Sequence, residues 1–253
     1  MELNSYIDHT NLKKDALVSD IEKLCEEAIT YHFASVCVYP YYVKAVSEYL
    51  EGTNIETCTV IGFPNGQSTT NTKVYEAIDA VENGATEIDM VINISALKNQ
   101  DYDYVKNEIE EIRDSIGGRV LKVIIETCLL SDEEIIKMTE ICNETFVNFI
   151  KTSTGFDKEG ATIHAIELIN ANKNDVLEIK ASGGIKDIKT AEAMIKAGAT
   201  RLGTSSGVKL MQVNEEVYNC LNDKKEKSCE CGSNHECNHE HNGDHKCNCK
   251  EEK

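Results

Sequence analysis

Residues 149–156 read Phe-Ile-Lys-Thr-Ser-Thr-Gly-Phe, a short apolar run that ends in Lys151 and opens into hydroxyl side chains and a glycine. An amphipathic segment follows at residues 162–172. A strand, a tight turn and a helix in this order form the unit of parallel α/β folds, which carry their chemistry at the carboxyl ends of the strands. The stretch therefore predicts a primary amine in a reactive position. The alternative is a lysine that only extends its charged end into solvent.

A second predicted strand ends in the same way. Residues 177–184 read Leu-Glu-Ile-Lys-Ala-Ser-Gly-Gly, with Lys180 in the alternating part. If the two strands are neighbours in a closed parallel barrel, Lys151 and Lys180 both point into its carboxyl-terminal mouth. Two ammonium groups held close together repel each other, so one amine is expected to be neutral and nucleophilic near neutral pH.

Short apolar runs alternate with helical patterns along most of the chain. This alternation predicts parallel strands joined by right-handed crossovers, and thus an α/β fold of the (β/α)8 TIM-barrel type. The helical patterns lie at residues 19–32, 41–50, 70–83, 102–116, 132–143, 162–172, 188–197 and 208–221. The eight expected strands lie at residues 6–10, 34–39, 55–63, 86–92, 120–126, 146–154, 176–182 and 200–204.

Charged residues alternate with aliphatic residues in several of these strands. In a barrel the aliphatic side chains must meet the helices, so the charged side chains point into the interior. Burial of an unpaired charge is costly, so we expect an internal network of paired acids and lysines, which is suited to moving protons. A two-layer sheet with solvated charges is the alternative. The residues expected to point inward are Glu87, Asp89, Lys122, Glu126, Lys151, Glu178 and Lys180.

The composition favours one large domain that acts on a small molecule. The 253 residues are 41% hydrophobic, and the formal net charge of -18 argues against a nucleic-acid or anionic-membrane partner. No apolar run approaches the roughly 20 residues that span a bilayer, and the amino-terminal residues lack a signal-peptide pattern. We therefore expect a cytoplasmic protein with a catalytic domain at residues 1–221. The sequence leaves the oligomeric state open, with a homodimer as one option.

Eight segments carry motifs: residues 7–10 (Ile-Asp-His-Thr), 36–40 (Val-Cys-Val-Tyr-Pro), 61–66 (Ile-Gly-Phe-Pro-Asn-Gly), 87–91 (Glu-Ile-Asp-Met-Val), 121–127 (Leu-Lys-Val-Ile-Ile-Glu-Thr), 149–156, 180–185 (Lys-Ala-Ser-Gly-Gly-Ile) and 201–206 (Arg-Leu-Gly-Thr-Ser-Ser). Together and in this order, they resemble the deoxyribose-phosphate aldolase family. The resemblance runs from about residue 3 to residue 221. Each motif alone has weak to moderate specificity, whereas eight in register are a strong signal.

The resemblance implies a class I aldolase, a lyase that needs no metal or other cofactor for catalysis. It would interconvert 2-deoxy-D-ribose 5-phosphate with D-glyceraldehyde 3-phosphate and acetaldehyde, in deoxyribose phosphate catabolism. Lys151 matches the Schiff-base lysine, and Lys180 matches the second lysine, whose positive charge favours a neutral neighbour. Asp89 matches the acid that transfers protons with Lys180. Thr154 is expected to orient the imine or a substrate hydroxyl, or to cap the turn.

A phosphate group is best bound by backbone donors at helix amino termini. Phosphate-binding barrels place this site after strands seven and eight, where this chain has glycines and serines. Such residues are also ordinary turn residues. Some relatives in the family have a lysine where this chain has Phe156, so binding here depends more on neutral amides. The expected phosphate site consists of Gly183, Gly184, Gly203, Ser205 and Ser206.

Residues 222–253 differ from the rest of the chain and from the resembled family. They contain almost no aliphatic residue and cannot form their own core. Closely spaced thiols and imidazoles suit zinc or copper(I), so we expect a metal-ordered tail, with a disordered extension or a disulfide cluster as alternatives. The candidate ligands are Cys229, Cys231, Cys237, Cys247, Cys249, His235, His239, His241 and His245.

Two other functions stay open from the sequence. In the first, the barrel is only a scaffold, and the tail makes the chain a metal-binding or metal-buffering protein. In the second, the Schiff-base chemistry is kept but acts on another phosphosugar. Covalent trapping at Lys151 and release of acetaldehyde distinguish these functions from the predicted aldolase.

Overall fold

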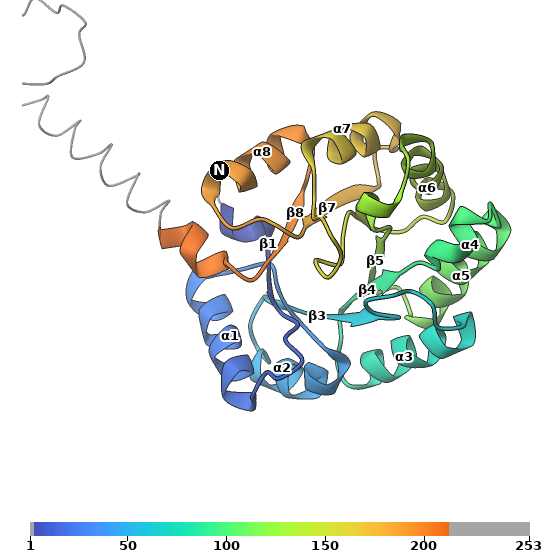
Figure 1. The fold of residues 1–253 in the computed structure, drawn as a ribbon. Helices are drawn as coiled ribbons and strands as arrows, with labels where there is room; N and C mark the ends of the chain where they lie inside the picture. Colours follow the sequence, from blue (N-terminus) through green and yellow to red (C-terminus); the bar gives the residue numbers. More distant parts are fainter. Residues whose placement is uncertain (1–2, 213–253) are drawn as a thin grey trace, which may run out of the picture. The chain divides into compact units, whose positions relative to one another are not determined.

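The computed structural model describes residues 3–212, which form a barrel of eight parallel strands surrounded by helices (Figure 1). Each strand pairs with the next one, and β8 pairs with β1 to close the barrel. The predicted (β/α)8 architecture is therefore confirmed. The strands are β1 (Ile7–Asn11), β2 (Ser35–Val38), β3 (Glu56–Ile61), β4 (Glu87–Val91), β5 (Val120–Ile124), β6 (Phe149–Lys151), β7 (Glu178–Ser182) and β8 (Arg201–Thr204).

Apart from α4 (Ile94–Lys98), the α-helices of the described residues lie at or near the positions that the apolar periodicity predicts. The structure also has three short 3-10 helices, η1 (Leu3–Tyr6) before β1, η2 (Pro40–Tyr42) after β2 and η3 (Thr127–Leu129) after β5, and residues 207–212 are helical after β8. The α-helices are α1 (Val18–Tyr31), α2 (Val43–Tyr49), α3 (Thr70–Glu82), α4 (Ile94–Lys98), α5 (Tyr102–Ser115), α6 (Asp132–Glu144), α7 (Ile163–Asn172) and α8 (Ile188–Ala197).

Two local features differ from the prediction. Helix α4 is too short for a periodic apolar pattern, and its only sequence signal is Asn93, whose side chain accepts a hydrogen bond from the Ala96 amide at 3.1 Å. Strand β6 is shorter than predicted. Phe146 adopts a left-handed backbone with a φ of 52°, which is incompatible with a strand, so the ladder begins only at Phe149.

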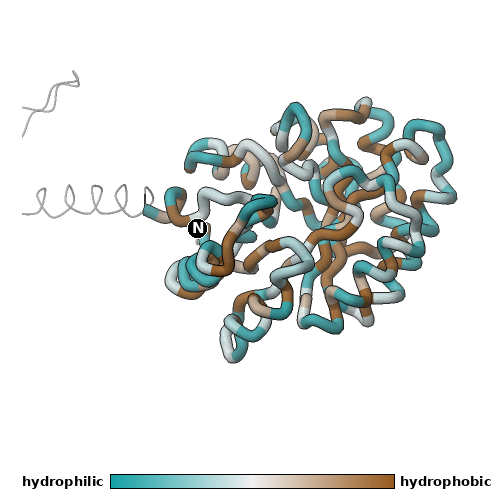
Figure 2. Tube along the Cα trace, turned by 60° about the horizontal axis from the view of Figure 1, so that its bottom comes forward, coloured by the Kyte–Doolittle hydropathy of each residue, from teal (hydrophilic) through white to brown (hydrophobic). Residues whose placement is uncertain are grey.

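The hydrophobic core lies between the barrel and the helices. Aliphatic residues of the strands, such as Ile88, Val123 and Ile179, are fully buried there with the apolar faces of the helices. Figure 2 shows the hydrophobic stretches along the strands at the centre and hydrophilic residues on the outer helices and loops. Because this face takes the aliphatic side chains, the alternate positions of each strand point into the barrel.

No helix within residues 3–212 is long and apolar enough to cross a membrane. The end of the predicted helix at 208–221, the domain boundary at residue 221 and the Cys/His-rich tail lie outside the described residues.

Candidate active site

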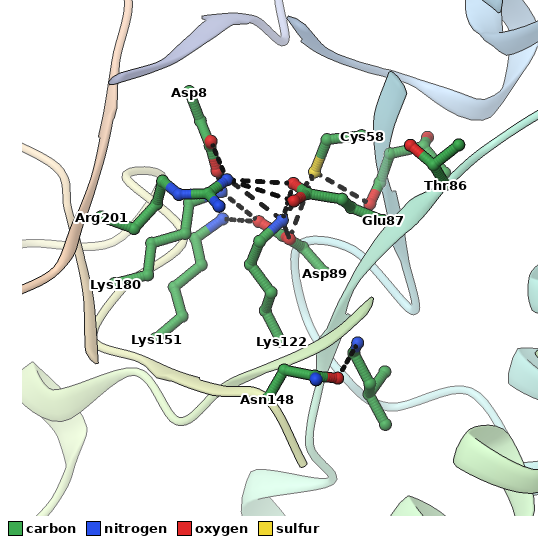
Figure 3. Close-up of polar contacts among 12 residues, drawn as sticks. Asp8, Cys58, Thr86, Glu87, Asp89, Lys122, Asn148, Lys151, Lys180 and Arg201 are labelled. Carbon is green, nitrogen blue, oxygen red and sulfur yellow. Dashed lines mark hydrogen bonds and ion pairs between the residues drawn. The ribbon is translucent and has the colours of Figure 1, made fainter. Parts of the chain in front are cut away.

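Two lysines face one carboxylate inside the barrel. Lys151 on β6 and Lys180 on β7 are register partners, and Asp89 lies on β4. Lys151 Nζ and Lys180 Nζ each donate to the same atom, Asp89 Oδ2, at 2.7 Å. Figure 3 shows both side chains converging on Asp89. The structure thus brings together the three residues that the sequence analysis selects for carbon–carbon chemistry.

A third lysine completes the environment of Asp89. Lys122 on β5 is the register partner of Asp89, and its Nζ donates to Asp89 Oδ1 at 2.9 Å and to Glu87 Oε2 at 2.6 Å. Cys58 donates to the same Asp89 oxygen, Oδ1, at 3.2 Å and accepts from Lys122 Nζ at 3.2 Å. Asp89 therefore has three ammonium groups and a thiol around its carboxylate and no exposed surface.

Asp8 and Arg201 extend the cluster toward β1 and β8. Asp8 forms ion pairs with Lys180 Nζ at 2.5 Å and with Arg201 at 2.7 Å, and Arg201 also contacts Glu87 at 3.2 Å. The sequence analysis did not assign inward roles to Asp8 and Arg201. The signal was their alternation with Ile7 and Leu202, but both lie at or near strand ends, where alternation over so few residues is weak.

The predicted internal network is confirmed for most of its members and wrong for Glu178. This residue begins β7, is exposed, and accepts a hydrogen bond from Thr200 Oγ1 at 3.1 Å outside the barrel. Glu126 is buried as expected, but it lies past the end of β5 and binds Thr154 instead of the lysines. The alternation of residues along a strand therefore does not determine how far along the barrel axis a side chain lies, and thus whether it reaches the lysines.

The ionic environment keeps the cluster charged. Burial acts to raise the pKa of Asp89, but Lys122, Lys151 and Lys180 outweigh it and hold the pKa well below its usual value. Burial acts to lower the pKa of Lys180, but Asp8 and Asp89 outweigh it and raise the pKa above its usual value. Both groups are thus ionised throughout the neutral pH range.

Within the ion pairs of this cluster, the basic groups outnumber the carboxylates by one. Its ion pairs join three carboxylates to four basic groups, all of them mostly or fully buried. A net charge inside a barrel is unfavourable because desolvation penalises it. The carboxylates belong to Asp8, Glu87 and Asp89, and the basic groups to Lys122, Lys151, Lys180 and Arg201.

A cavity of about 810 Å³ opens at the carboxyl ends of the strands. Lys151 lines it, whereas Lys180 and Asp89 do not and lie behind Lys151. The β1–α1 loop forms the outer wall, and Phe156 forms part of the rim, where its ring packs edge-on against Phe63 at 5.2 Å between centroids. A ligand in this cavity therefore meets the Lys151 amine first.

Four of the five predicted phosphate-binding residues line this cavity. Gly183 and Gly184 have φ values of 82° and 80°, a left-handed backbone that favours glycine. The fifth residue, Ser206, is not in the lining, and its amide donates to Thr204 Oγ1 at 2.9 Å. Lys186, which the sequence analysis did not select, adds a positive charge to the lining. The lining members of the predicted set are Gly183, Gly184, Gly203 and Ser205.

Thr154 also lines the cavity, three residues after Lys151. Its hydroxyl donates to the Glu126 carboxylate and accepts from the Phe156 amide at 3.1 Å. The expected turn-capping role of Thr154 is thus confirmed by the Phe156 contact. Thr154 still borders the cavity that Lys151 lines.

The buried acids and thiols of the barrel are poor metal ligands in this arrangement. Cys37, Cys58 and Asp89 place one ligand atom each within 4.8 Å of the others. However, the ammonium groups of Lys122, Lys151 and Lys180 already surround the carboxylate, and they repel a cation.

Comparison with known proteins identifies the family. The model of the DeoC/LacD family aldolases matches residues 3–213. A deoxyribose-phosphate aldolase of Clostridioides difficile is 54% identical over 211 residues, which cover 83% of this chain and 95% of that protein. One of Clostridium tetani is 51% identical over 213 residues, or 84% of this chain and 99% of the relative.

Solved structures agree with these relatives. A putative deoxyribose-phosphate aldolase from Coccidioides immitis superposes with a TM-score of 0.83 at 40% identity, covering 85% of this chain and 86% of that one. The deoxyribose phosphate aldolase from Aeropyrum pernix, described as a tetramer, gives 0.79 at 32% identity, covering 85% and 92%. The match to the family model spans the whole described barrel, including Lys151, Lys180 and the residues that line the cavity. The chain therefore belongs to the DeoC/LacD family of aldolases.

Proposed function

We propose that this aldolase cleaves 2-deoxy-D-ribose 5-phosphate to acetaldehyde and D-glyceraldehyde 3-phosphate through a Schiff base on Lys151. The observation that carries the proposal is the sharing of one Asp89 oxygen by Lys151 and Lys180, with only Lys151 facing the cavity. Relatives that carry the name deoxyribose-phosphate aldolase support the substrate.

The reaction starts with a neutral amine. The cluster loses its net charge when one of its basic groups gives up a proton, and Lys151 is the group next to the cavity. Its nitrogen attacks the C1 aldehyde of the open-chain sugar to form a carbinolamine, which loses water to give an iminium ion. Lys180, whose pKa is raised by Asp8 and Asp89 despite its burial, stays protonated and supplies the proton for the departing water.

The iminium ion then accepts the electrons of the C2–C3 bond. Acetaldehyde takes C1 and C2 of the sugar, so this is the bond that breaks. The C3 hydroxyl loses its proton and becomes the aldehyde of D-glyceraldehyde 3-phosphate, while C1 and C2 remain on Lys151 as an enamine. Protonation at C2 and hydrolysis of the resulting iminium ion release acetaldehyde and restore the amine.

Asp89 is the proposed proton carrier between the two lysines. Its Oδ2 contacts both ammonium groups at 2.7 Å, so a proton can pass between the nitrogen atoms without a large movement. Lys122 holds the other oxygen at 2.9 Å and keeps the carboxylate in place. A salt bridge that only stabilises the barrel is the alternative for these contacts.

The phosphate group is expected at the part of the cavity wall that the segments after β7 and β8 form. Gly183, Gly184, Gly203 and Ser205 offer backbone and hydroxyl donors after β7 and β8, and Lys186 offers a charge. Ser206 remains in the proposed set because it precedes the helical residues 207–212, whose amino terminus favours an anion. Phe156 offers no donor at the position where some relatives have a lysine.

Several further properties are part of this proposal. Catalysis uses the chain's own residues and no cofactor, the protein acts in the cytoplasm, and a homodimer stays a prediction. The tail is proposed to bind zinc or copper independently of the barrel. Membership in an aldolase family disfavours a pure metal-buffering function.

Borohydride reduction in the presence of 2-deoxy-D-ribose 5-phosphate tests the proposal. We expect a covalent two-carbon adduct on Lys151 by peptide mass spectrometry, no adduct on Lys151→Ala, and release of acetaldehyde by the unreduced enzyme. An adduct on another lysine would exclude the assigned nucleophile. An adduct without acetaldehyde release would indicate a different phosphosugar.

A further inference from the structure

Glu126 is a buried acid in an unusual backbone conformation near the carboxyl end of β5. It has 2% of its surface exposed and a left-handed backbone with a φ of 53°. This conformation costs a non-glycine residue roughly 1–2 kcal/mol. Such strain persists where the surrounding structure holds a residue for a purpose, often at a functional site.

In the described part of the chain, the Glu126 carboxylate has neutral hydrogen-bond donors and no ion-pair partner. It accepts from the Thr154 amide at 3.2 Å and from the Thr154 hydroxyl, and Cys128 Sγ lies 3.9 Å away. Within residues 3–212, no lysine, arginine or histidine lies close enough to form an ion pair with it, and the charge of Lys151, which pairs with Asp89, lowers its pKa only weakly. Burial therefore raises the pKa of Glu126, although the Thr154 hydrogen bonds oppose this shift.

These contacts determine what the Thr154 hydroxyl can offer to a ligand. Its only hydrogen is donated to Glu126, and one lone pair accepts from the Phe156 amide at 3.1 Å. The oxygen has one lone pair left, and Thr154 lines the cavity together with Lys151. The hydroxyl can therefore accept a hydrogen bond from a ligand but cannot donate one.

We propose that Glu126 is a positioning residue that orients the Thr154 hydroxyl to accept a hydrogen bond from a hydroxyl group on the three-carbon half of the substrate. The inference rests on the proposed function and extends it to substrate selection. A hydroxylated aldehyde is recognised in this way, whereas acetaldehyde alone has no hydroxyl to donate. Glu126 thus acts on cleavage and not on Schiff-base formation.

The two half-reactions separate these effects. In deuterated water, the Schiff base of acetaldehyde on Lys151 exchanges its methyl hydrogens through the enamine without any three-carbon fragment. We expect Glu126→Leu and Thr154→Val to lower kcat/KM for cleavage by about 10- to 100-fold, because a hydrogen bond to the substrate is lost. Acetaldehyde exchange should stay within about threefold of the parent enzyme.

Conservative variants and a double variant sharpen the test. Glu126→Gln keeps an acceptor for the Thr154 hydroxyl, and Thr154→Ser keeps the hydroxyl, so both should recover most of the cleavage rate. Because Glu126 acts through Thr154, Glu126→Leu combined with Thr154→Val should be no worse than either single variant. Additive losses would overturn the positioning role.

Two variants outside the cavity serve as matched controls. Thr162 Oγ1 accepts from the Ala165 amide at 3.1 Å, the same kind of contact that Thr154 makes with Phe156. Glu108 is a buried carboxylate that accepts from the Asn93 amide at 3.1 Å, and burial raises its pKa as well. Unlike Glu126 it also forms an ion pair with Lys73 at 2.7 Å, so Glu108→Gln controls for the general cost of altering a buried acid. Thr162→Val and Glu108→Gln should lower thermal stability without changing the ratio of cleavage to exchange.

The outcomes distinguish this inference from the proposed function. If the parent enzyme gives neither acetaldehyde exchange nor a borohydride adduct, the proposed function fails. If the parent enzyme cleaves its substrate and Glu126→Leu and Thr154→Val do so equally well, only the role of Glu126 is wrong. Should Glu126→Leu fail to fold, Thr154→Val and Glu126→Gln still decide the question.

Discussion

Lys151 and Lys180 are register partners on neighbouring strands, and their ammonium groups donate to one oxygen of Asp89 at 2.7 Å each. Only Lys151 reaches the cavity, so the pair is asymmetric: one amine can meet an aldehyde, and the other is held behind it by Asp8 and Asp89. This asymmetry leads to the first two predictions.

Lys180→Leu should lower kcat for cleavage by about 10²- to 10⁴-fold, because proton transfer by a positioned group contributes that much. The substitution also leaves Asp8 and Asp89 with one cation fewer, so a loss of thermal stability is expected. Initial rates of acetaldehyde release, with unfolding curves on the same samples, measure both effects. A folded variant that retains more than a tenth of the parent rate would contradict the role of Lys180.

Asp89→Asn should lower both cleavage and acetaldehyde exchange by about 100-fold or more. The amide cannot carry a proton between Lys151 and Lys180, and each of the two reactions needs that transfer. This pattern differs from the one expected for Glu126, where exchange survives. Equal exchange rates in Asp89→Asn and the parent enzyme would assign Asp89 a structural role only.

Gly184→Ala should raise KM for the phosphorylated substrate about fivefold to tenfold and leave kcat within about twofold. The glycine has a φ of 80°, and no atom lies within 4 Å of an added Cβ, so the cost is backbone strain that displaces the loop. Gly118 has the same φ of 80° and the same open space away from the cavity, which makes Gly118→Ala the matched control. An equal rise in KM for both variants would remove Gly184 from the phosphate site.

The stability of the barrel should decrease in acid because of Asp8. Burial acts to raise the pKa of Asp8, but Lys180, Lys122 and Arg201 outweigh it and hold the pKa well below the value of about 3.9 in the unfolded chain. The stabilisation is thus complete above about pH 4 and decreases as the pH falls further.

Thermal unfolding of the parent enzyme and of Asp8→Asn measures this contribution. At pH 7 the variant should be less stable by about 3 kcal/mol, the order expected when a buried ion pair loses one partner. The two unfolding curves should approach each other as the pH decreases from about 4 to about 2. A constant difference over this range would show that the Asp8 charge does not contribute.

A chain that ends at residue 221 should cleave 2-deoxy-D-ribose 5-phosphate at the rate of the full chain. The family model ends at residue 213, and the candidate ligands begin at Cys229. Metal analysis should find zinc or copper on the full chain and none on the shortened one. If shortening abolishes cleavage with and without added metal, the tail takes part in catalysis or folding.

The sequence was sufficient to predict the barrel and the placement of Lys151 and Lys180 side by side inside it. Strand order, the alternation of aliphatic and charged side chains, and the two Lys-containing strand ends are local patterns, and the barrel geometry follows from them. Helix α4 was not predicted, because a five-residue helix is too short to show a period. The predicted β6 began too early, because the left-handed backbone of Phe146 leaves no signal in the sequence.

Only the tertiary structure decided which partners each buried charge has. Asp8 and Arg201 are 193 residues apart in sequence, and Lys180 and Asp89 are 91 residues apart, so no local pattern pairs them. The shear of the barrel and the position of a side chain along the barrel axis determine these contacts. For this reason Glu126 accepts a hydrogen bond from Thr154 instead of pairing with a lysine. Alternation tells which side chains face inward, whereas closure of the sheet determines which of them meet.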